Sequence, residues 1–353
     1  VPTEKTSLDR AFPEFLVQLR LNLNVSAAQL RKRYLTPLRK YINVVEQLMC
    51  SGQWDKIDYT KVPSVAMQYY REVFRKHDPE RFDSWVRALT AGKSKVNVSQ
   101  LYPHTVVEKY LTGHSLFDEL TEAQFAEMVK QTKKLGSFAK SLVISDTSGS
   151  MSGTPMTVSV ALGILISWCM EGPFKGMMIS FSESPEFWQL TGYNLYEDVR
   201  RLRMMSAGGS TNLDAVFEKI VDRAVEMKVP PEEMPNRLYI LTDMQFNQAT
   251  WTLKDDWYDY IQERIDGLPP KTSALQRAKV LFQKHGYTVP EIVCWNLRGD
   301  IKNVASPDLE PGVAMISGFS TSILKCVMKG EIPDPYTVMK NCLLDERYAR
   351  LTV

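Results

Sequence analysis

Carboxylate and hydroxyl side chains gather in one short segment of this chain, Asp146-Thr147-Ser148-Gly149-Ser150. The segment follows the apolar run Leu142–Ile144, which is typical of a buried strand, and it precedes a predicted helix with Pro155 in its first turn. Oxygen-bearing side chains at the end of a strand suit a hard divalent cation such as Mg²⁺, which prefers about six oxygen ligands and retains some water. The spacing therefore predicts one part of a magnesium site.

Two later segments have the same character. Gly208–Leu213 contains Thr211, and Leu238–Asp243 is a second apolar run that ends in a carboxylate. Each segment alone has a simpler interpretation, because Asp and Ser are favoured helix caps and Asp also starts turns. On this interpretation the caps are Asp146 with Ser148 and Thr211 with Asn212, and the turn starts at Asp243. All three segments occur in this one chain, first the Asp146 loop, then the Thr211 loop and then Asp243, and a predicted strand precedes each aspartate. That order favours a shared metal site over three unrelated caps and turns.

Together, the three segments resemble the metal-ion-dependent adhesion site of von Willebrand factor A domains. The resemblance implies that one divalent ion is held by five residues: Asp146, Ser148, Ser150, Thr211 and Asp243. By the same resemblance the serine hydroxyls ligate directly, the threonine ligates directly or through water, and the aspartates act mainly through bound water. Mg²⁺ is the expected ion, with Mn²⁺ or Ca²⁺ as substitutes. Because hydroxyl ligands leave the ion electrophilic, the expected ligand is a carboxylate of a partner protein.

Length and composition are those of an ordinary water-soluble chain. At 353 residues it has room for two domains, and 44% hydrophobic residues allow a full core. No apolar stretch reaches about 18 residues, so we expect no transmembrane helix and no membrane partner. The cysteines are scattered and odd in number: Cys50, Cys169, Cys294, Cys326 and Cys342. Such cysteines are typical of reduced thiols, so we expect a cytoplasmic protein, with the nucleus as a second compartment.

The first 135 residues predict helices. Apolar residues at helical spacing run from Leu30 to Met49, with Ser26 as the cap of this helix. Further helices are predicted at Pro63–Phe74, Pro79–Leu89, Val106–Leu111 and Glu122–Lys133. This pattern predicts an all-α domain over residues 1–137, with its joint at Gly136-Ser137. Because the joint is short, we expect the helical segment to pack against the rest of the chain instead of hanging from a flexible linker.

Strands and helices alternate in the remainder of the chain. Strands are predicted at Leu142–Ser145, Gly176–Phe181, Phe187–Leu190, Leu238–Thr242, Glu291–Trp295 and Val313–Ile316. Helices are predicted at Thr157–Met170, Leu195–Arg203, Leu213–Met227, Ala274–His285 and Ser320–Val327. This alternation predicts an α/β domain over residues 138–353, with a Rossmann-like, doubly wound and mainly parallel six-stranded sheet. Ligands of such sheets bind at the carboxyl ends of the strands, where the predicted metal residues lie.

A second resemblance covers nearly the whole chain. The segments that carry it are Leu35–Lys40, Lys61–Met67, His77–Phe82, Gly92–Asn97, Leu101–His104, Ser152–Met156 and Pro311–Ala314. They resemble the uncharacterised proteins grouped as domain of unknown function 2828. The architecture, a helical half followed by an α/β half, is similar to that of the Ro RNA-binding autoantigen, although the helical part here is much shorter. The similarity implies a small structured RNA as a further partner.

Basic residues cluster near the N-terminus, at Arg31, Lys32, Arg33, Arg39 and Lys40. The cluster has two interpretations, a patch that binds RNA phosphates or a solvated helix face.

Taken together, the sequence predicts a non-catalytic, Mg²⁺-dependent binding module. If the basic cluster binds RNA, this module is part of a ribonucleoprotein. The alternative is a protein-interaction scaffold that binds no RNA. A metal-dependent hydrolase is the least favoured reading, since the sequence has no G-x-S-x-G motif and indicates no base beside the serines. The oligomeric state is not predicted.

Overall fold

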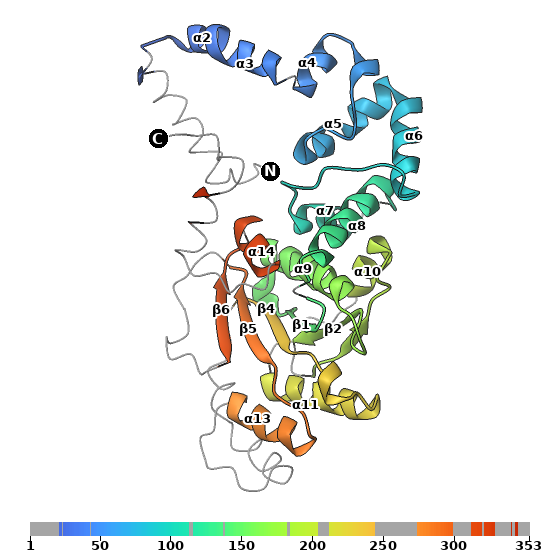
Figure 1. Ribbon diagram of the computed structural model, residues 1–353, viewed down its shortest axis with the longest axis vertical. Helices are drawn as coiled ribbons and strands as arrows, with labels where there is room; N and C mark the ends of the chain where they lie inside the picture. Colours follow the sequence, from blue (N-terminus) through green and yellow to red (C-terminus); the bar gives the residue numbers. More distant parts are fainter. Residues whose placement is uncertain are drawn as a thin grey trace. The chain divides into compact units, whose positions relative to one another are not determined.

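The computed structural model describes residues 21–22, 24–42, 44–112, 116–136, 138–181, 184–203, 212–243, 274–298, 312–319, 321–328, 340 and 343–344 (Figure 1). Thr211, with the glycines before it, and Cys342 lie outside these ranges. The chain divides into two compact units, Val1–Trp85 and Val86–Val353. Each unit is described by itself.

The first unit is helical over its described residues. Its elements are α2 (Ala27–Leu30), the π-helix η1 (Arg31–Leu35), α3 (Thr36–Tyr41), α4 (Val45–Cys50), the 3-10 helix η2 (Trp54–Lys56), α5 (Ser64–His77) and the first part of α6 (Pro79–Thr90). Ser26 caps α2 as predicted, in a reciprocal box with Gln29. The prediction of one helix from Leu30 to Met49 is wrong, because Val44 has extended dihedrals and starts a new helix.

An aromatic cluster forms the core of this unit. Phe74 and Phe82 are fully buried, and the ring of Tyr59 packs against both, with centroids 5.3 and 5.2 Å apart. Arg81 ties the preceding loop to α6 by donating hydrogen bonds of 2.8 Å to the carbonyls of Trp54 and Ile57. The unit therefore has a small core of its own.

The second unit contains the sheet. Its helices are the end of α6, α7 (Pro103–Leu111), α8 (Glu119–Lys133), the 3-10 helix η3 (Gly149–Met151), α9 (Thr154–Cys169), α10 (Leu195–Leu202), α11 (Leu213–Glu226), the 3-10 helix η4 (Pro231–Glu233), α13 (Ala274–Lys284) and α14 (Thr321–Met328). Its strands are β1 (Ser141–Asp146), β2 (Met177–Phe181), β3 (Phe187–Gln189), β4 (Arg237–Thr242), β5 (Glu291–Asn296) and β6 (Val313–Ser317). All six predicted strands are present, with ends that differ by one residue at most.

The six strands form one sheet in the order β3-β2-β1-β4-β5-β6. The pairs β1–β2, β1–β4, β4–β5 and β5–β6 are parallel, and β3 joins the edge antiparallel to β2. The prediction of a mainly parallel six-stranded sheet is therefore confirmed. The strand order reverses at β1, so the carboxyl ends of β1 and β4 border the crevice where open α/β sheets bind ligands.

Helix α9 is covered by the sheet and by three other helices. It packs against β1, β2 and β4, and α7, α8 and α10 pack against α9 in turn (Figure 1). Accordingly, residues Val158–Cys169 are all buried, and so is every residue of β1. The phenyl ring of Phe125 on α8 meets the indole of Trp168 edge to face, with centroids 5.3 Å apart. For α7 and α8, the expected packing of the helical segment against the α/β part is confirmed.

No helix within the described ranges is long and apolar enough to cross a membrane. The four described cysteines are free thiols; Cys169, Cys294 and Cys326 are buried, whereas Cys50 is exposed. Burial raises the pKa of Cys169 and of Cys294 to about 12, so these two thiols stay protonated.

Candidate metal centre

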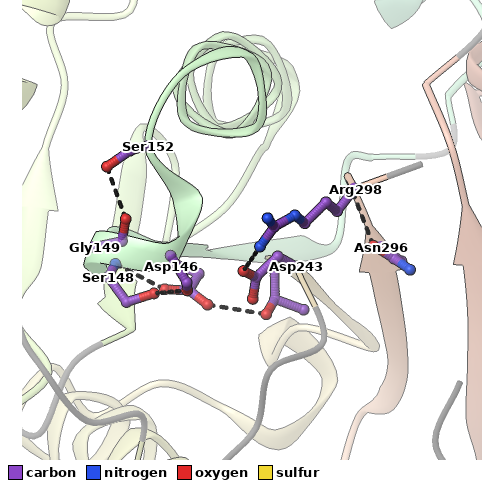
Figure 2. Close-up of polar contacts among 9 residues, drawn as sticks. Asp146, Ser148, Gly149, Ser152, Asp243, Asn296 and Arg298 are labelled. Carbon is purple, nitrogen blue, oxygen red and sulfur yellow. Dashed lines mark hydrogen bonds and ion pairs between the residues drawn. The ribbon is translucent and has the colours of Figure 1, made fainter. Parts of the chain in front are cut away.

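The loop after β1 is built around the carboxylate of Asp146. This residue ends the central strand and is buried, and its Oδ1 atom accepts a hydrogen bond of 2.9 Å from the backbone N–H of Ser148 (Figure 2). The tight turn that results brings the Oγ atoms of Ser148 and Ser150 within 2.9 Å of each other. The three predicted oxygen donors of this loop therefore lie together.

The end of β4 completes the other side of the site. Because Ser145 pairs with Leu241 in the parallel register, the following residues, Asp146 and Thr242, lie next to each other. The hydroxyl of Thr242 donates a hydrogen bond of 2.9 Å to Oδ2 of Asp146. Asp243 follows directly and is also buried, 6% exposed. Both predicted aspartates thus lie at the carboxyl ends of neighbouring strands, where the sequence analysis expected them.

The two carboxylates influence each other. Burial is the main cause that raises the pKa of Asp146 above its ordinary value, and the negative charge of Asp243 raises it further. The hydrogen bonds from Ser148 and Thr242 act in the opposite direction and stabilise the ionised form. A buried pair of like charges is more stable with a positive charge beside it, which is the electrostatic requirement of a cation site.

The helix-cap interpretation is only partly correct. Asp146 closes the turn at Ser148 and does not cap a longer helix; Ser148 precedes η3 without a side-chain cap bond, and Gly153 is the residue before α9. Asn212 does cap α11, because its side chain accepts from the N–H of Ala215 at 3.1 Å. Thr211, the fifth predicted ligand, lies outside the described residues, so its place in the site stays a prediction.

Asn296 and Arg298 belong to the site but were not predicted. The Nη1 atom of Arg298 lies 3.5 Å from Oδ2 of Asp243, and the N–H of Arg298 donates to Oδ1 of Asn296 at 2.9 Å (Figure 2). A signal for them was available, since both residues follow a predicted strand whose carboxyl end belongs to the same sheet edge. What the sequence lacked was the strand order, which brings β5 beside β4.

The donor atoms fit a hard cation better than a soft one. Within the described residues, no three histidine, cysteine, aspartate or glutamate side chains come together as a metal-binding group. The site offers instead two carboxylates and the hydroxyls of Ser148 and Ser150. Oxygen donors of this kind suit Mg²⁺, Mn²⁺ or Ca²⁺, whereas zinc and copper prefer imidazole and thiolate.

The five predicted RNA-contacting residues belong to the first unit, whereas the candidate metal ligands belong to the second. Arg31, Lys32 and Arg33 belong to η1, and Arg39 and Lys40 to the last turn of α3. All five are exposed. Tyr34 and Tyr41, which directly follow the two basic runs in the sequence, are also exposed, at 40% and 88%. The segment thus presents positive charge and aromatic surface together.

Comparisons with known proteins divide the chain at the joint between its helical and α/β parts. The model for Domain of unknown function (DUF2828) matches residues 11–138, which confirms that resemblance for the helical part. An uncharacterized protein, L728 of Acanthamoeba polyphaga mimivirus, is 35% identical over 356 residues. The alignment covers 97% of this chain but 59% of the viral protein, so the chain spans less than two thirds of that relative.

Among solved structures, the crystal structure of the Deinococcus radiodurans RO (RSR) protein matches 72% of this chain and 49% of its own, with 15% identity. Its TM-score of 0.42 is too low to establish a shared fold. The α/β part has a clearer assignment. The model for Domain of unknown function (DUF7788) matches residues 140–344, which is more than half of the sequence, and the chain therefore belongs to that family.

Proposed function

We propose that the α/β part is a von Willebrand factor A-like binding module, which captures an acidic group of a partner protein through a Mg²⁺ ion. The observation that carries this proposal is the separation of 2.9 Å between the Oγ atoms of Ser148 and Ser150. In an octahedral shell with Mg–O distances near 2.1 Å, adjacent ligand oxygens are about 3 Å apart. In the structure the two hydroxyls are hydrogen-bonded to each other, and the same spacing suits neighbouring ligands of one such ion.

The other residues have the roles that this geometry allows. Asp146 and Asp243 supply negative charge beside the hydroxyls, and Thr211 is the remaining expected ligand. A bound cation would supply Lewis acidity and a position for one outside ligand. Because the serine ligands are neutral, the ion keeps enough charge to attract a carboxylate, and the partner's Asp or Glu is the natural donor.

Binding is favoured over catalysis by the state of the Asp146 carboxylate. Each of its oxygens accepts a hydrogen bond, one from the Ser148 N–H and one from the Thr242 hydroxyl. These two bonds take one acceptor position on each oxygen and fix the carboxylate against the loop and β4, as suits a group that adds charge beside an ion. We therefore propose a non-catalytic site, with Mn²⁺ or Ca²⁺ able to replace Mg²⁺.

Isothermal titration of the metal-free full chain with MgCl₂ tests the proposal. Asp146→Asn keeps an oxygen acceptor for the Ser148 N–H but removes the charge, so it should abolish measurable Mg²⁺ binding with little change in metal-free melting temperature. Asp222→Asn, at an exposed position of α11, is the matched control and should bind as the wild type does. Absence of Mg²⁺ binding by the wild type at millimolar concentration would overturn the proposal.

A second candidate function, RNA binding, is favoured by the exposed basic residues of η1 and α3 with Tyr34 and Tyr41 among them. Lysine and arginine neutralise phosphates, and exposed aromatic rings stack on unpaired bases. Filter binding of a structured RNA across a salt series tests it. A steep loss of affinity with rising salt supports an RNA-binding protein. The salt dependence should be weaker in the triple variant with Ala at Arg31, Arg33 and Arg39. No binding at low salt supports the alternative, a scaffold for protein partners alone.

A further inference from the structure

The turn after β5 is held rigidly against the end of β4. Asn296 pairs with Thr242 in the parallel register, and the N–H of Leu297 donates to the Thr242 carbonyl at 2.9 Å. The side chain of Asn296 then accepts from the N–H of Arg298 at 2.9 Å, which bends the chain over the end of the sheet. Two hydrogen bonds thus fix the backbone from which Arg298 starts.

From this position the guanidinium of Arg298 reaches Asp243. The Nη1–Oδ2 distance is 3.5 Å, which is an ion pair of ordinary length. The exposures of the two side chains differ greatly, at 1% for Asp243 and 39% for Arg298. The carboxylate is therefore confined within the protein, whereas the side chain of Arg298 is partly exposed to water.

Two negative charges at the carboxyl ends of β1 and β4 favour a positively charged side chain beside them. Asp146 and Asp243 are buried close enough for the charge of Asp243 to raise the pKa of Asp146. Without a cation their repulsion opposes folding, and a guanidinium beside Asp243 offsets part of it. A divalent ion beside the same carboxylates would be repelled by that guanidinium. The two cations thus compete for one negative site.

We propose that Arg298 is the internal counterion of the metal centre: it neutralises Asp243 when no metal is bound and leaves that carboxylate when Mg²⁺ binds. This inference rests on the proposed metal site and adds a regulation to it. By stabilising the metal-free form, Arg298 lowers the affinity for Mg²⁺ and sets the concentration at which the site fills.

Arg298→Gln in the full chain tests the proposal with Mg²⁺ alone as the probe. Loss of the competing charge should raise Mg²⁺ affinity about tenfold, since a half-exposed pair lies between the weak surface pairs and the strong buried ones. The metal-free melting temperature should fall, and saturating Mg²⁺ should raise it by more than in the wild type. Arg298→Lys keeps a cation and should stay within about threefold of the wild type.

The matched control is Arg223→Gln, which breaks an ion pair of 2.8 Å with Glu226 in the last turn of α11, at the opposite end of that helix from Asn212. It should leave Mg²⁺ affinity unchanged. If Arg298→Gln leaves the affinity unchanged or weakens it while Asp146→Asn abolishes binding, the counterion role is wrong and the metal site stands. If the wild type and Arg298→Gln both fail to bind Mg²⁺, the metal site and the counterion role are both wrong.

Discussion

Asp146 and Thr242 are 96 residues apart in the sequence, yet the hydroxyl of Thr242 lies 2.9 Å from Oδ2 of Asp146 and donates to it. Thr242 is fully buried. Thr242→Val should therefore leave a buried carboxylate oxygen without this donor and lower the free energy of unfolding by about 1–3 kcal/mol. Urea denaturation measures the loss. Thr242→Ser keeps the hydroxyl and should recover most of it. Because valine keeps the methyl group of threonine, an unchanged stability of Thr242→Val would mean that the hydrogen bond does not stabilise the fold.

His104 should make the protein sensitive to mild acid. Its ring packs against Phe319 and Tyr102, with centroids 5.3 and 5.2 Å apart, and burial lowers its pKa to about 4. Because the unfolded chain has the ordinary value near 6.5, it takes up a proton first as the pH falls, so stability is lost between about pH 6.5 and 4.

The expected loss is about 1–3 kcal/mol, reduced from the full shift because the ring is only partly buried. Urea midpoints measured from pH 7 to pH 4 should fall less steeply for His104→Phe than for the wild type. Parallel pH profiles would show that His104 is not responsible.

Gly163 marks the closest approach of α9 to the sheet. A Cβ atom at this position would lie 2.6 Å from Sδ of Met178 and 2.9 Å from Oγ of Ser145. Gly163→Ala should therefore destabilise the fold by about 1–3 kcal/mol, although alanine favours helices by about 1 kcal/mol. Gly149→Ala, where nothing lies within 4 Å of the added atom, is the control for thermal melting. A melting temperature for Gly163→Ala at or above that of the wild type contradicts the argument.

A buried ion pair joins α11 to α13. Arg277 donates from Nε and Nη2 to the two carboxylate oxygens of Asp214, at 2.8 and 2.6 Å, and its side chain is 3% exposed. Arg277→Met removes one partner and leaves the carboxylate buried, which should cost about 3–5 kcal/mol in chemical denaturation. Adding Asp214→Leu should recover most of that loss, because the second charge then disappears as well. If the double variant is no more stable than the single one, the packing of Arg277 matters more than its charge.

The sheet was predictable because each strand is a short apolar run bounded by turn residues, as in Leu142–Ser145 and Leu238–Thr242. The placement of Asp146 and Asp243 at one edge of the sheet was predictable for a related reason, since the polar residues after such runs meet at one edge of a parallel sheet. The long helix from Leu30 was not correctly predicted. Its apolar spacing continues past Val44, and the periodicity did not reveal the extended backbone there.

Thr242 and Arg298 show the limit of reading the site from sequence. A threonine before a strand-end aspartate is unremarkable until the register places it opposite Asp146. Arg298 is one of many arginines, and its meaning comes from the adjacency of β5 and β4, which no local pattern encodes. The residue types indicated the oxygen-bearing side chains of the site, whereas its hydrogen bonds and the ion pair of Arg298 with Asp243 follow from the order of the strands.

The carboxylate of Glu122 has a consequence for how the chain can be divided. It lies on α8, yet it accepts hydrogen bonds of 2.8 and 3.0 Å from the N–H groups of Leu195 and Tyr196, the first two residues of α10. Asn194 caps the same helix by accepting from the N–H of Glu197, so the region of one family match completes the N-terminal cap of a helix in the other. A fragment that begins at residue 140 would keep every strand but lack this cap and the cover over Trp168. The proposed metal site is therefore best studied in the full chain, since α8, which packs against α9, lies in the region of the neighbouring family match.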